Sequence, residues 1–245
     1  MPLFQLQDIK KSFGAKQVLR GVDLTVNTGE TLVVLGGSGT GKSVLLRMLI
    51  GLIPADTGKI LFEGKDITHL KEREYYPIRK RVSYLFQGGA LFDSMNIYEN
   101  LAYPLREHTE MSHEEILPIV RESLARVELE KVEHLFPSDL SGGMMKRAAL
   151  ARAIINKPEV ILYDEPTTGL DPMTTQTINR LIRKLQDELE ITSVVVTHDM
   201  STTRHVADQL AFLENGRIAF RGTLEEAERS DHRMLNAYLT GGRFE

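Results

Sequence analysis

The stretch TLVVLGGSGTGKSVLLRMLIGL, residues 31–52, decides the fold. Its first six residues form a short apolar run, which predicts a strand buried on both faces. A glycine-rich turn follows, and the apolar spacing of residues 44–52 predicts a helix after it. In such a strand–turn–helix unit the backbone N–H groups can point at phosphate oxygens, because small residues let the chain curl closely. The unit therefore predicts an α/β fold with a phosphate-binding turn.

The turn matches the P-loop pattern of a glycine, four residues, then glycine-lysine-serine. Lys42 supplies a point charge for the outer phosphates, and the Ser43 hydroxyl is placed to bind Mg²⁺. The alternative, a glycine-rich turn without a ligand, does not account for the buried strand before it and the helix after it. The predicted nucleotide-binding residues here are Gly36, Gly37, Ser38, Gly39, Thr40, Gly41, Lys42, Ser43 and Val44.

Composition limits the remaining possibilities. The 245 residues suit one large domain, or one domain with a sizeable insertion. A net charge of −4 argues against nonspecific nucleic-acid binding, and the absence of cysteine fits a reducing compartment. The N-terminus has no apolar run of signal-peptide length, and residues 45–53 are too short to span a bilayer and include Arg47. We therefore expect a cytoplasmic chain that reaches a membrane only through a partner.

The rest of the chain alternates strands and helices. Strands are predicted in residues 4–13, 18–26, 58–64 and 82–86, and the strand pattern returns in residues 159–166, 192–199, 209–216 and 217–222. A helix over 173–189 separates two of the later strands, which predicts a largely parallel sheet. Residues 90–157 lack strand-like runs, and Ser112 with Glu115 forms a capping-box pattern there. After Gly222, two short helices are predicted with Thr223 as an N-cap; they either contact a second subunit or cover the sheet edge.

The stretch VILYDEP, residues 160–166, supplies a second half for a nucleotide site. Its apolar strand delivers Asp164 to the carboxyl end of the sheet, where ligands of parallel sheets bind. We expect Asp164 to hold Mg²⁺ through a water, and Glu165 to polarise the attacking water as general base. The alternative is a surface acidic pair that starts a turn before Pro166.

A second anion site is predicted where LSGG, residues 140–143, opens a helix. The first N–H groups of that helix have no intrahelical partner, and the helix dipole favours a phosphate oxygen there. The alternative is a plain N-cap serine followed by flexible glycines. Gly142 and Gly143 each cost helix stability by about 1 kcal/mol relative to alanine, so a close ligand contact would justify them.

Together, GGSGTGKS, LSGGM, YDEP and VVTHD occur in the order and approximate spacing of the ATP-binding cassette (ABC) ATPases, which this chain resembles over nearly its whole length. The resemblance implies an ATP- and Mg²⁺-dependent ATPase with a RecA-like core, an antiparallel β subdomain and an inserted helical subdomain. It implies a core of residues 1–88 and 159–222, a helical subdomain of residues 89–158 and a C-terminal extension of residues 223–245. It also implies a head-to-tail homodimer in which Ser141, Gly142 and Gly143 of one copy contact the γ-phosphate held by the other.

Four further site residues follow from the resemblance. Phe13 is similar to the aromatic residue that stacks on adenine, although a core aromatic of an edge strand is the alternative. Gln87 matches the glutamine that touches Mg²⁺ and the attacking water while its loop meets a membrane permease. Asp171 matches the aspartate of the loop that crosses the dimer contact, and His198 matches the switch histidine near the γ-phosphate.

Two differences from many ABC ATPases indicate a subfamily. Met144 stands where many cassettes have glutamine, and QGGALF, residues 87–92, follows the strand. Both resemble the ATPases of Mla- and Mce-type lipid transport systems. This implies phospholipid movement between membranes, an integral-membrane permease, possible MCE-type and small accessory subunits, and a peripheral place on the cytoplasmic side of the inner membrane. Another ABC transporter, or a soluble ABC ATPase of DNA repair or translation, remains an alternative.

A last expectation concerns the residues after Gln87. Ala90, Leu91, Phe92 and Met95 offer an apolar lip for a short helix of a permease. Alternatively, they pack the helical insert, as apolar residues after a strand usually do.

Overall fold

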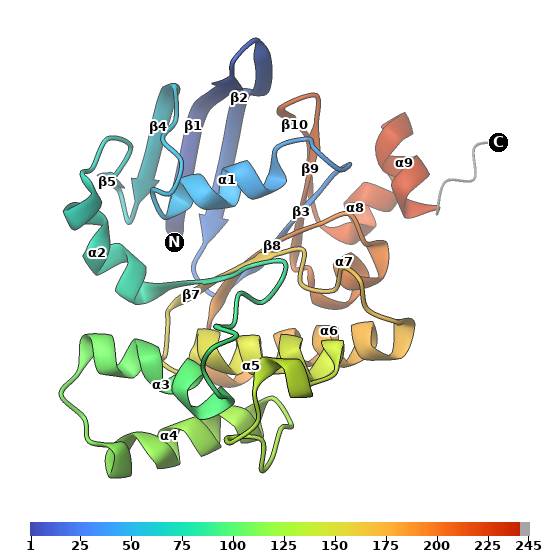
Figure 1. Cartoon of the computed structure of the whole chain (residues 1–245). Coiled ribbons are helices and arrows are strands. Elements are labelled where there is room, and N and C mark those ends of the chain that lie inside the picture. Colours follow the sequence, from blue (N-terminus) through green and yellow to red (C-terminus); the bar gives the residue numbers. More distant parts are fainter. Residues whose placement is uncertain (241–245) are drawn as a thin grey trace.

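The computed structural model describes residues 1–240, which form two sheets with helices around them (Figure 1). The larger sheet has six strands in the order β10-β9-β3-β8-β7-β6, and the smaller has four in the order β2-β1-β4-β5. The strands are β1 (Pro2–Phe13), β2 (Lys16–Asn27), β3 (Thr31–Leu35), β4 (Thr57–Phe62), β5 (Lys65–Asp66), β6 (Val82–Leu85), β7 (Val160–Asp164), β8 (Thr192–Thr197), β9 (Gln209–Glu214) and β10 (Arg217–Gly222).

The six-stranded sheet is parallel except at one edge. Strand β3 lies between β8 and β9 and runs parallel to both, and β6, β7 and β8 pair in parallel as well. Only β10 is antiparallel, because it returns from β9 through a tight turn. Every residue of β3, β7 and β8 is buried, as expected of parallel strands covered on both faces. The predicted α/β fold with a largely parallel sheet is therefore confirmed.

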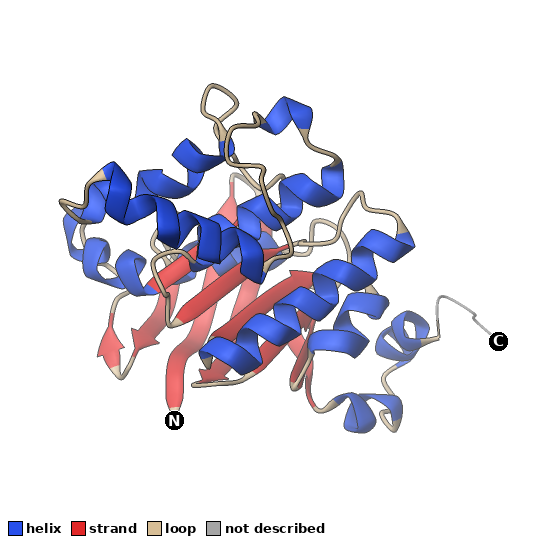
Figure 2. Cartoon of the chain, turned by 90° about the horizontal axis from the view of Figure 1, so that it is seen from below, coloured by secondary structure: helices blue, strands red, loops and turns tan. Residues whose placement is uncertain are grey.

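The helices surround this sheet. They are α1 (Lys42–Leu49), α2 (Glu72–Arg81), α3 (Ile97–His108), α4 (His113–Arg126), the 3₁₀ turn Pro137–Asp139, α5 (Gly142–Ile154), α6 (Pro172–Leu189), α7 (Met200–Val206), α8 (Leu224–Glu228) and α9 (Arg233–Leu239). Figure 2, viewed from below, shows the helices of the lower half of Figure 1 lying across one face of the strands. None of the described helices combines the length and the apolar character that crossing a membrane requires.

The side chains of strand β3 point alternately to the two faces of the sheet, so the core has two parts. Val33 and Leu35 pack with the apolar residues of α3 to α6 on one face. Leu32 and Val34 pack on the other face with α1 and the four-stranded antiparallel sheet, where the rings of Phe4 and Phe62 lie 4.7 Å apart. The phosphate-binding turn leaves the end of this central strand, so both cores fix its position.

Several local predictions are confirmed. No strand occurs between β6 and β7, and Ser112 caps α4 by accepting a hydrogen bond from the N–H of Glu115. Thr223 caps α8 in the same way. The two C-terminal helices pack over the sheet edge, where the ring of Tyr238 lies 5.4 Å from that of Phe212 on β9. Residues 241–245 of the expected C-terminal extension lie outside the described residues.

Candidate nucleotide site

The turn between β3 and α1 has a backbone that only glycine adopts easily. Gly41 has a φ of +107°, and a Cβ atom on it would lie 2.8 Å from the side chains of Val18 and Leu19. A Cβ on Gly36 would lie 2.5 Å from the carbonyl oxygen of Leu213. Both positions lack room for a side chain, so these two glycines are required by the chain's own packing as well as by any ligand.

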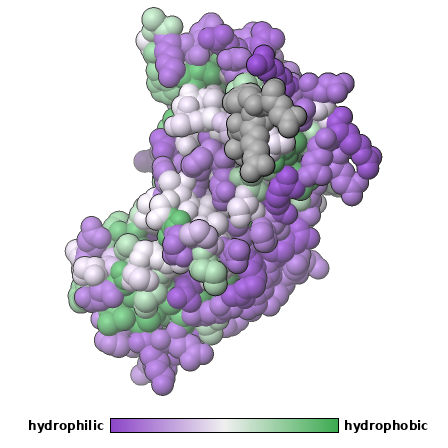
Figure 3. All heavy atoms as spheres, turned by 90° about the vertical axis from the view of Figure 1, so that its right-hand side faces the viewer, coloured by the Kyte–Doolittle hydropathy of each residue, from purple (hydrophilic) through white to green (hydrophobic). Residues whose placement is uncertain are grey.

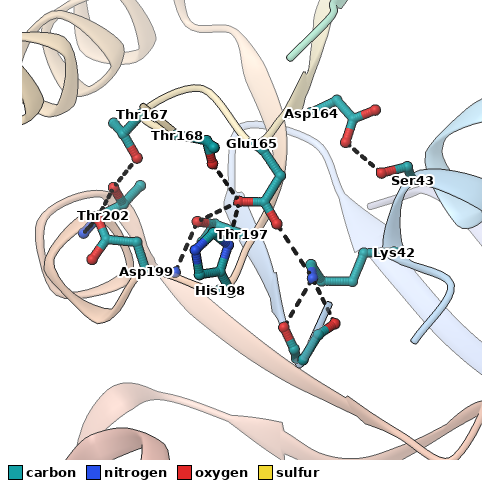
Figure 4. A network of polar contacts seen from close by, with 12 residues as sticks. Lys42, Ser43, Asp164, Glu165, Thr167, Thr168, Thr197, His198, Asp199 and Thr202 are labelled. Carbon is teal, nitrogen blue, oxygen red and sulfur yellow. Dashed lines mark hydrogen bonds and ion pairs between the residues drawn. The ribbon is translucent and has the colours of Figure 1, made fainter. Parts of the chain in front are cut away.

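Donors and a cation converge inside the turn. Among the described residues, the N–H groups of Gly41, Lys42 and Ser43 donate to no other group of the chain, as expected for the first turn of a helix. The buried Lys42 ammonium donates to the carbonyl oxygens of Gly36 and Gly37, at 2.9 and 3.0 Å (Figure 4). Free N–H groups and a positive charge in one small concavity fit a phosphate group.

Asp164 lies at the end of β7, where the sequence predicts it, and the two oxygens of its carboxylate have different partners. The Ser43 hydroxyl donates to Oδ1 at 2.6 Å, and the Tyr84 hydroxyl donates to Oδ2 at 2.7 Å. Since Ser43 gives its proton to Asp164, its lone pairs stay free for a cation. A hydroxyl oxygen beside a buried carboxylate is a ligand set that suits Mg²⁺.

Glu165 connects three parts of the site. Its Oε1 lies 3.3 Å from the Lys42 ammonium, and its Oε2 lies 2.9 Å from Nδ1 of His198 (Figure 4). The Thr168 hydroxyl donates to the same Oε2 at 3.1 Å. Burial alone would raise the pKa of Glu165, but the hydrogen bond with His198 and the charge of Lys42 outweigh it. The pKa therefore lies below the usual value, and Glu165 is ionised at neutral pH.

A cavity of about 700 Å³ extends from the turn toward the tip of β1. The ring of Phe13 lines it and is 49% exposed, so it is available to a flat ligand. Gln87 and His198 line the same cavity. The cavity is lined by Phe13, Lys16, Val18, Ser38, Gly39, Gly41, Lys42, Ser43, Val44, Gln87, Glu165, Thr168, His198 and Tyr238.

Ser141 and Gly142 lie on exposed surface and do not line this cavity, and Gly143 and Asp171 are likewise absent from it. Ser141 caps its own helix by accepting from the N–H of Met144. Asp171 caps α6 by accepting from the N–H groups of Met173 and Thr174.

Packing within the chain also favours glycine at position 143, which was not predicted from the sequence. A Cβ atom there would lie 2.6 Å from the methyl group of Thr174, at the start of α6. Gly142 has no comparable constraint, since its nearest neighbour would be 3.9 Å away.

Of the apolar residues after Gln87, some are exposed, as a permease contact requires, and others pack against the core. Phe92 is exposed and its ring lies 5.3 Å from that of Tyr103, whereas Leu91 packs against the core. Arg152 of α5 donates to the carbonyl oxygens of Gly89 and Ala90, both at 2.8 Å. This loop is therefore tied to the helix that begins at Ser141.

Three residues near the site were not predicted from the sequence. Tyr84 contacts Asp164, and Tyr238 of α9 lines the cavity beside Gly37. The buried Lys146 ammonium donates to the carbonyl oxygen of Gln87. Burial lowers the pKa of Lys146, and the nearby carboxylates of Asp164 and Glu165 oppose that shift. None of these three belongs to a pattern with fixed spacing, so only the folded chain reveals them.

A parallel sheet with a phosphate-binding turn at its central strand, next to an acidic pair and a histidine, defines a P-loop ATPase. A family model described as ABC transporter matches residues 19–168, and the chain belongs to that family as an ATPase subunit.

Relatives and solved structures agree with this assignment. Over 239 residues the chain is 43% identical to the probable ribonucleotide transport ATP-binding protein mkl of Mycobacterium tuberculosis (strain H37Rv), covering 98% of this chain and 67% of that protein. It is 39% identical to the intermembrane phospholipid transport system ATP-binding protein MlaF of Escherichia coli K12, covering 98% and 89%. The post-hydrolysis dimer of the cassette MJ0796, bound to ADP and Pi, superposes with a TM-score of 0.83 at 32% identity, covering 90% of this chain and 98% of that one. The cassette cbiO1 of Clostridium perfringens gives 0.85 at 27%, covering 97% and 95%. The predicted ABC ATPase fold and the resemblance to Mla-type ATPases are confirmed.

Proposed function

We propose that two copies of the chain close head to tail around two molecules of Mg·ATP. The observation that carries this proposal is the position of the second anion site. Ser141 and Gly142 lie on exposed surface, outside the chain's own P-loop cavity. Within the described part of the chain, the N–H groups of Gly142 and Gly143 donate to no other group, as expected at a helix start. A second copy can bring its own triphosphate to them. The MJ0796 cassette, which this chain resembles, is a dimer bound to ADP and Pi.

A second cavity supports the dimer. It measures about 720 Å³ and lies between the loop of residues 167–172, the start of α7 and helix α9. Its lining includes the apolar side chains of Leu170, Met200, Met234 and Tyr238. Asp171, the N-cap of α6, lies between two lining residues of this cavity, Leu170 and Pro172. We propose that the corresponding loop of the partner copy packs here.

Within each cavity, the P-loop N–H groups and Lys42 bind the phosphates, and Phe13 stacks on the adenine. ATP drives closure only if it binds the closed pair more tightly than the open one. Contacts from Ser141, Gly142 and Gly143 of the partner copy would supply that difference.

Glu165 acts as general base for the attacking water. It is ionised, and its Oε2 is held by His198, so its proton-accepting oxygen has a fixed direction. His198 and Lys42 then stabilise charge near the γ-phosphate. Mg²⁺ held by Ser43, Gln87 and Asp164 would neutralise charge on the phosphate oxygens.

The loop after Gln87 is the contact for a membrane permease. Phe92 is exposed there, and Arg152 ties the loop to the helix that carries Ser141. On the face shown in Figure 3, hydrophobic side chains gather in separate patches within a mainly hydrophilic surface. A mainly hydrophilic surface suits a chain that reaches the membrane through a permease, and we place the chain peripherally on the cytoplasmic side of the inner membrane.

We propose phospholipids, moved between membranes, as the cargo. The relatives of E. coli and Haemophilus influenzae that are described as phospholipid transport ATPases are 39% and 38% identical over 98% of this chain. An MCE-type lipid-binding protein and a small accessory subunit would complete such a system. The mycobacterial relatives are described as ribonucleotide transporters, so ribonucleotides are the competing cargo.

The test is to purify the chain from membranes in mild detergent and to identify what accompanies it. We expect a polytopic permease and bound phospholipid, and phospholipid vesicles should raise the ATPase rate of the complex. A permease that carries ribonucleotide and no phospholipid would contradict the cargo assignment. Ribosomes or DNA in place of a permease would contradict the transporter assignment.

A further inference from the structure

The hydroxyl of Tyr84 donates one of the two hydrogen bonds that hold the Asp164 carboxylate. It donates to Oδ2 at 2.7 Å, while Ser43 donates to Oδ1 at 2.6 Å. The Arg47 guanidinium lies 3.8 Å from the same Oδ2, and its side chain is 43% exposed, so solvent weakens that contact. Tyr84 is therefore the short, directional restraint on Oδ2.

The backbone places Tyr84 for this role. Strands β6 and β7 pair in parallel with Tyr84 opposite Leu162, two residues before Asp164. The tyrosine ring is long enough to span that offset, and it packs at 4.4 Å against the ring of Phe86. The ring is thus held by packing, and only the hydroxyl reaches the carboxylate.

We propose that Tyr84 is a positioning residue for the divalent metal of the nucleotide site. The inference rests on the proposed metal-binding role of Asp164. The terminal torsion of an aspartate is broad, so a carboxylate held at one oxygen can still turn. When the Tyr84 hydroxyl holds Oδ2, the Oδ1 atom of Asp164 stays beside the Ser43 hydroxyl. The Oδ1 atom and the Ser43 hydroxyl oxygen can then face the metal together. Groups that orient metal ligands commonly contribute about 10- to 100-fold in metal affinity.

Tyr84→Phe tests this directly, because it removes the hydroxyl and keeps the packed ring. The measurement is binding of a fluorescent, non-hydrolysable ATP analogue to the purified full chain as Mg²⁺ is added. We expect the Mg²⁺ concentration at half-saturation to rise about tenfold. Analogue binding without Mg²⁺ should stay unchanged, because Tyr84 does not line the nucleotide cavity. Replacing Mg²⁺ by Mn²⁺ and reading its electron paramagnetic resonance signal gives the metal affinity without nucleotide turnover.

Tyr75→Phe is the matched control, since the Tyr75 hydroxyl also donates a hydrogen bond, to the carbonyl oxygen of Ile67 away from the site. Its Mg²⁺ dependence should equal that of the natural chain. An unchanged half-saturation in Tyr84→Phe, within twofold, would overturn the proposal, as would an equal rise in both variants. A natural chain that binds the analogue without any Mg²⁺ dependence would instead overturn the metal role of Asp164, and the inference with it.

Discussion

Gly143→Ala, combined with a second substitution, separates two reasons for the glycine of the second anion site. The structure gives one reason, because a Cβ atom would lie 2.6 Å from the Thr174 methyl group. The proposed function gives the other, since a bare backbone is needed for a partner's phosphate to approach. A single substitution affects both, so a second change is required to tell them apart.

The two effects have different magnitudes. Overpacking of this kind costs about 1–3 kcal/mol, and replacing a helical glycine by alanine returns about 1 kcal/mol, so the net loss of stability is about 0–2 kcal/mol. Alanine keeps the backbone N–H of residue 143, but its methyl group would hold a partner's phosphate away from it. We expect this to lower turnover by about 10²–10³-fold, as the loss of a donor to developing charge does. Catalysis should therefore suffer far more than folding.

Thr174→Ser supplies the second change. It removes the methyl group that the new Cβ would meet and keeps the hydroxyl that donates to the Asp171 carboxylate. In Gly143→Ala with Thr174→Ser, urea unfolding should show the stability restored. Phosphate release should stay low, because the phosphate approach remains blocked.

Thr174→Ser alone is the control and should retain both stability and turnover. Recovery of turnover together with stability in the double variant would refute the reasoning, since Gly143 would then serve packing within its own chain only.

Two further predictions concern charged groups. Glu165→Gln should lower turnover by about 10²–10⁴-fold, while ATP still binds and pairs of chains accumulate on size-exclusion chromatography. Glu214→Gln is the control, because it changes another carboxylate that is paired with a histidine. Near-normal turnover in Glu165→Gln would contradict the assignment of Glu165 as general base. Burial would raise the pKa of Asp208, but hydrogen bonds led by that of Arg183 outweigh it, so the pKa lies below 3.8. The stability that Asp208 contributes is thus present above pH 3.8 and lost as the pH falls below it, and Asp208→Asn should be less stable at pH 7 with a flatter acid dependence in urea unfolding. Parallel acid curves for both chains would argue against this.

The P-loop could be predicted because residue type alone determines its local structure. A buried strand, then positions that tolerate no side chain, such as Gly36 and Gly41, then a helix is a pattern within one short segment. The position of Asp164 followed for a similar reason, since the carboxyl ends of parallel strands meet at one edge.

Contacts between distant segments could not be predicted. Tyr84 lies 80 residues from Asp164 in the chain, and Lys146 lies 59 residues from Gln87. Such pairs form only when β6, β7 and α5 come together, and each residue alone is typical of its strand or helix. Helix α2 was missed because only Tyr75 and Ile78 of its ten residues are buried, so its apolar face is too short to show a period.

Mixing two inactive chains tests the shared pocket most directly. One carries Lys42→Ala in the P-loop, and the other carries Ser141→Arg in the second anion site. A mixed pair then contains one pocket with both changes and one with neither. An equal mixture should recover about a quarter of natural turnover, because about half of the pairs are mixed and each has one of two sites intact. A mixture that stays as inactive as its two components would contradict the claim that each copy completes the other's site.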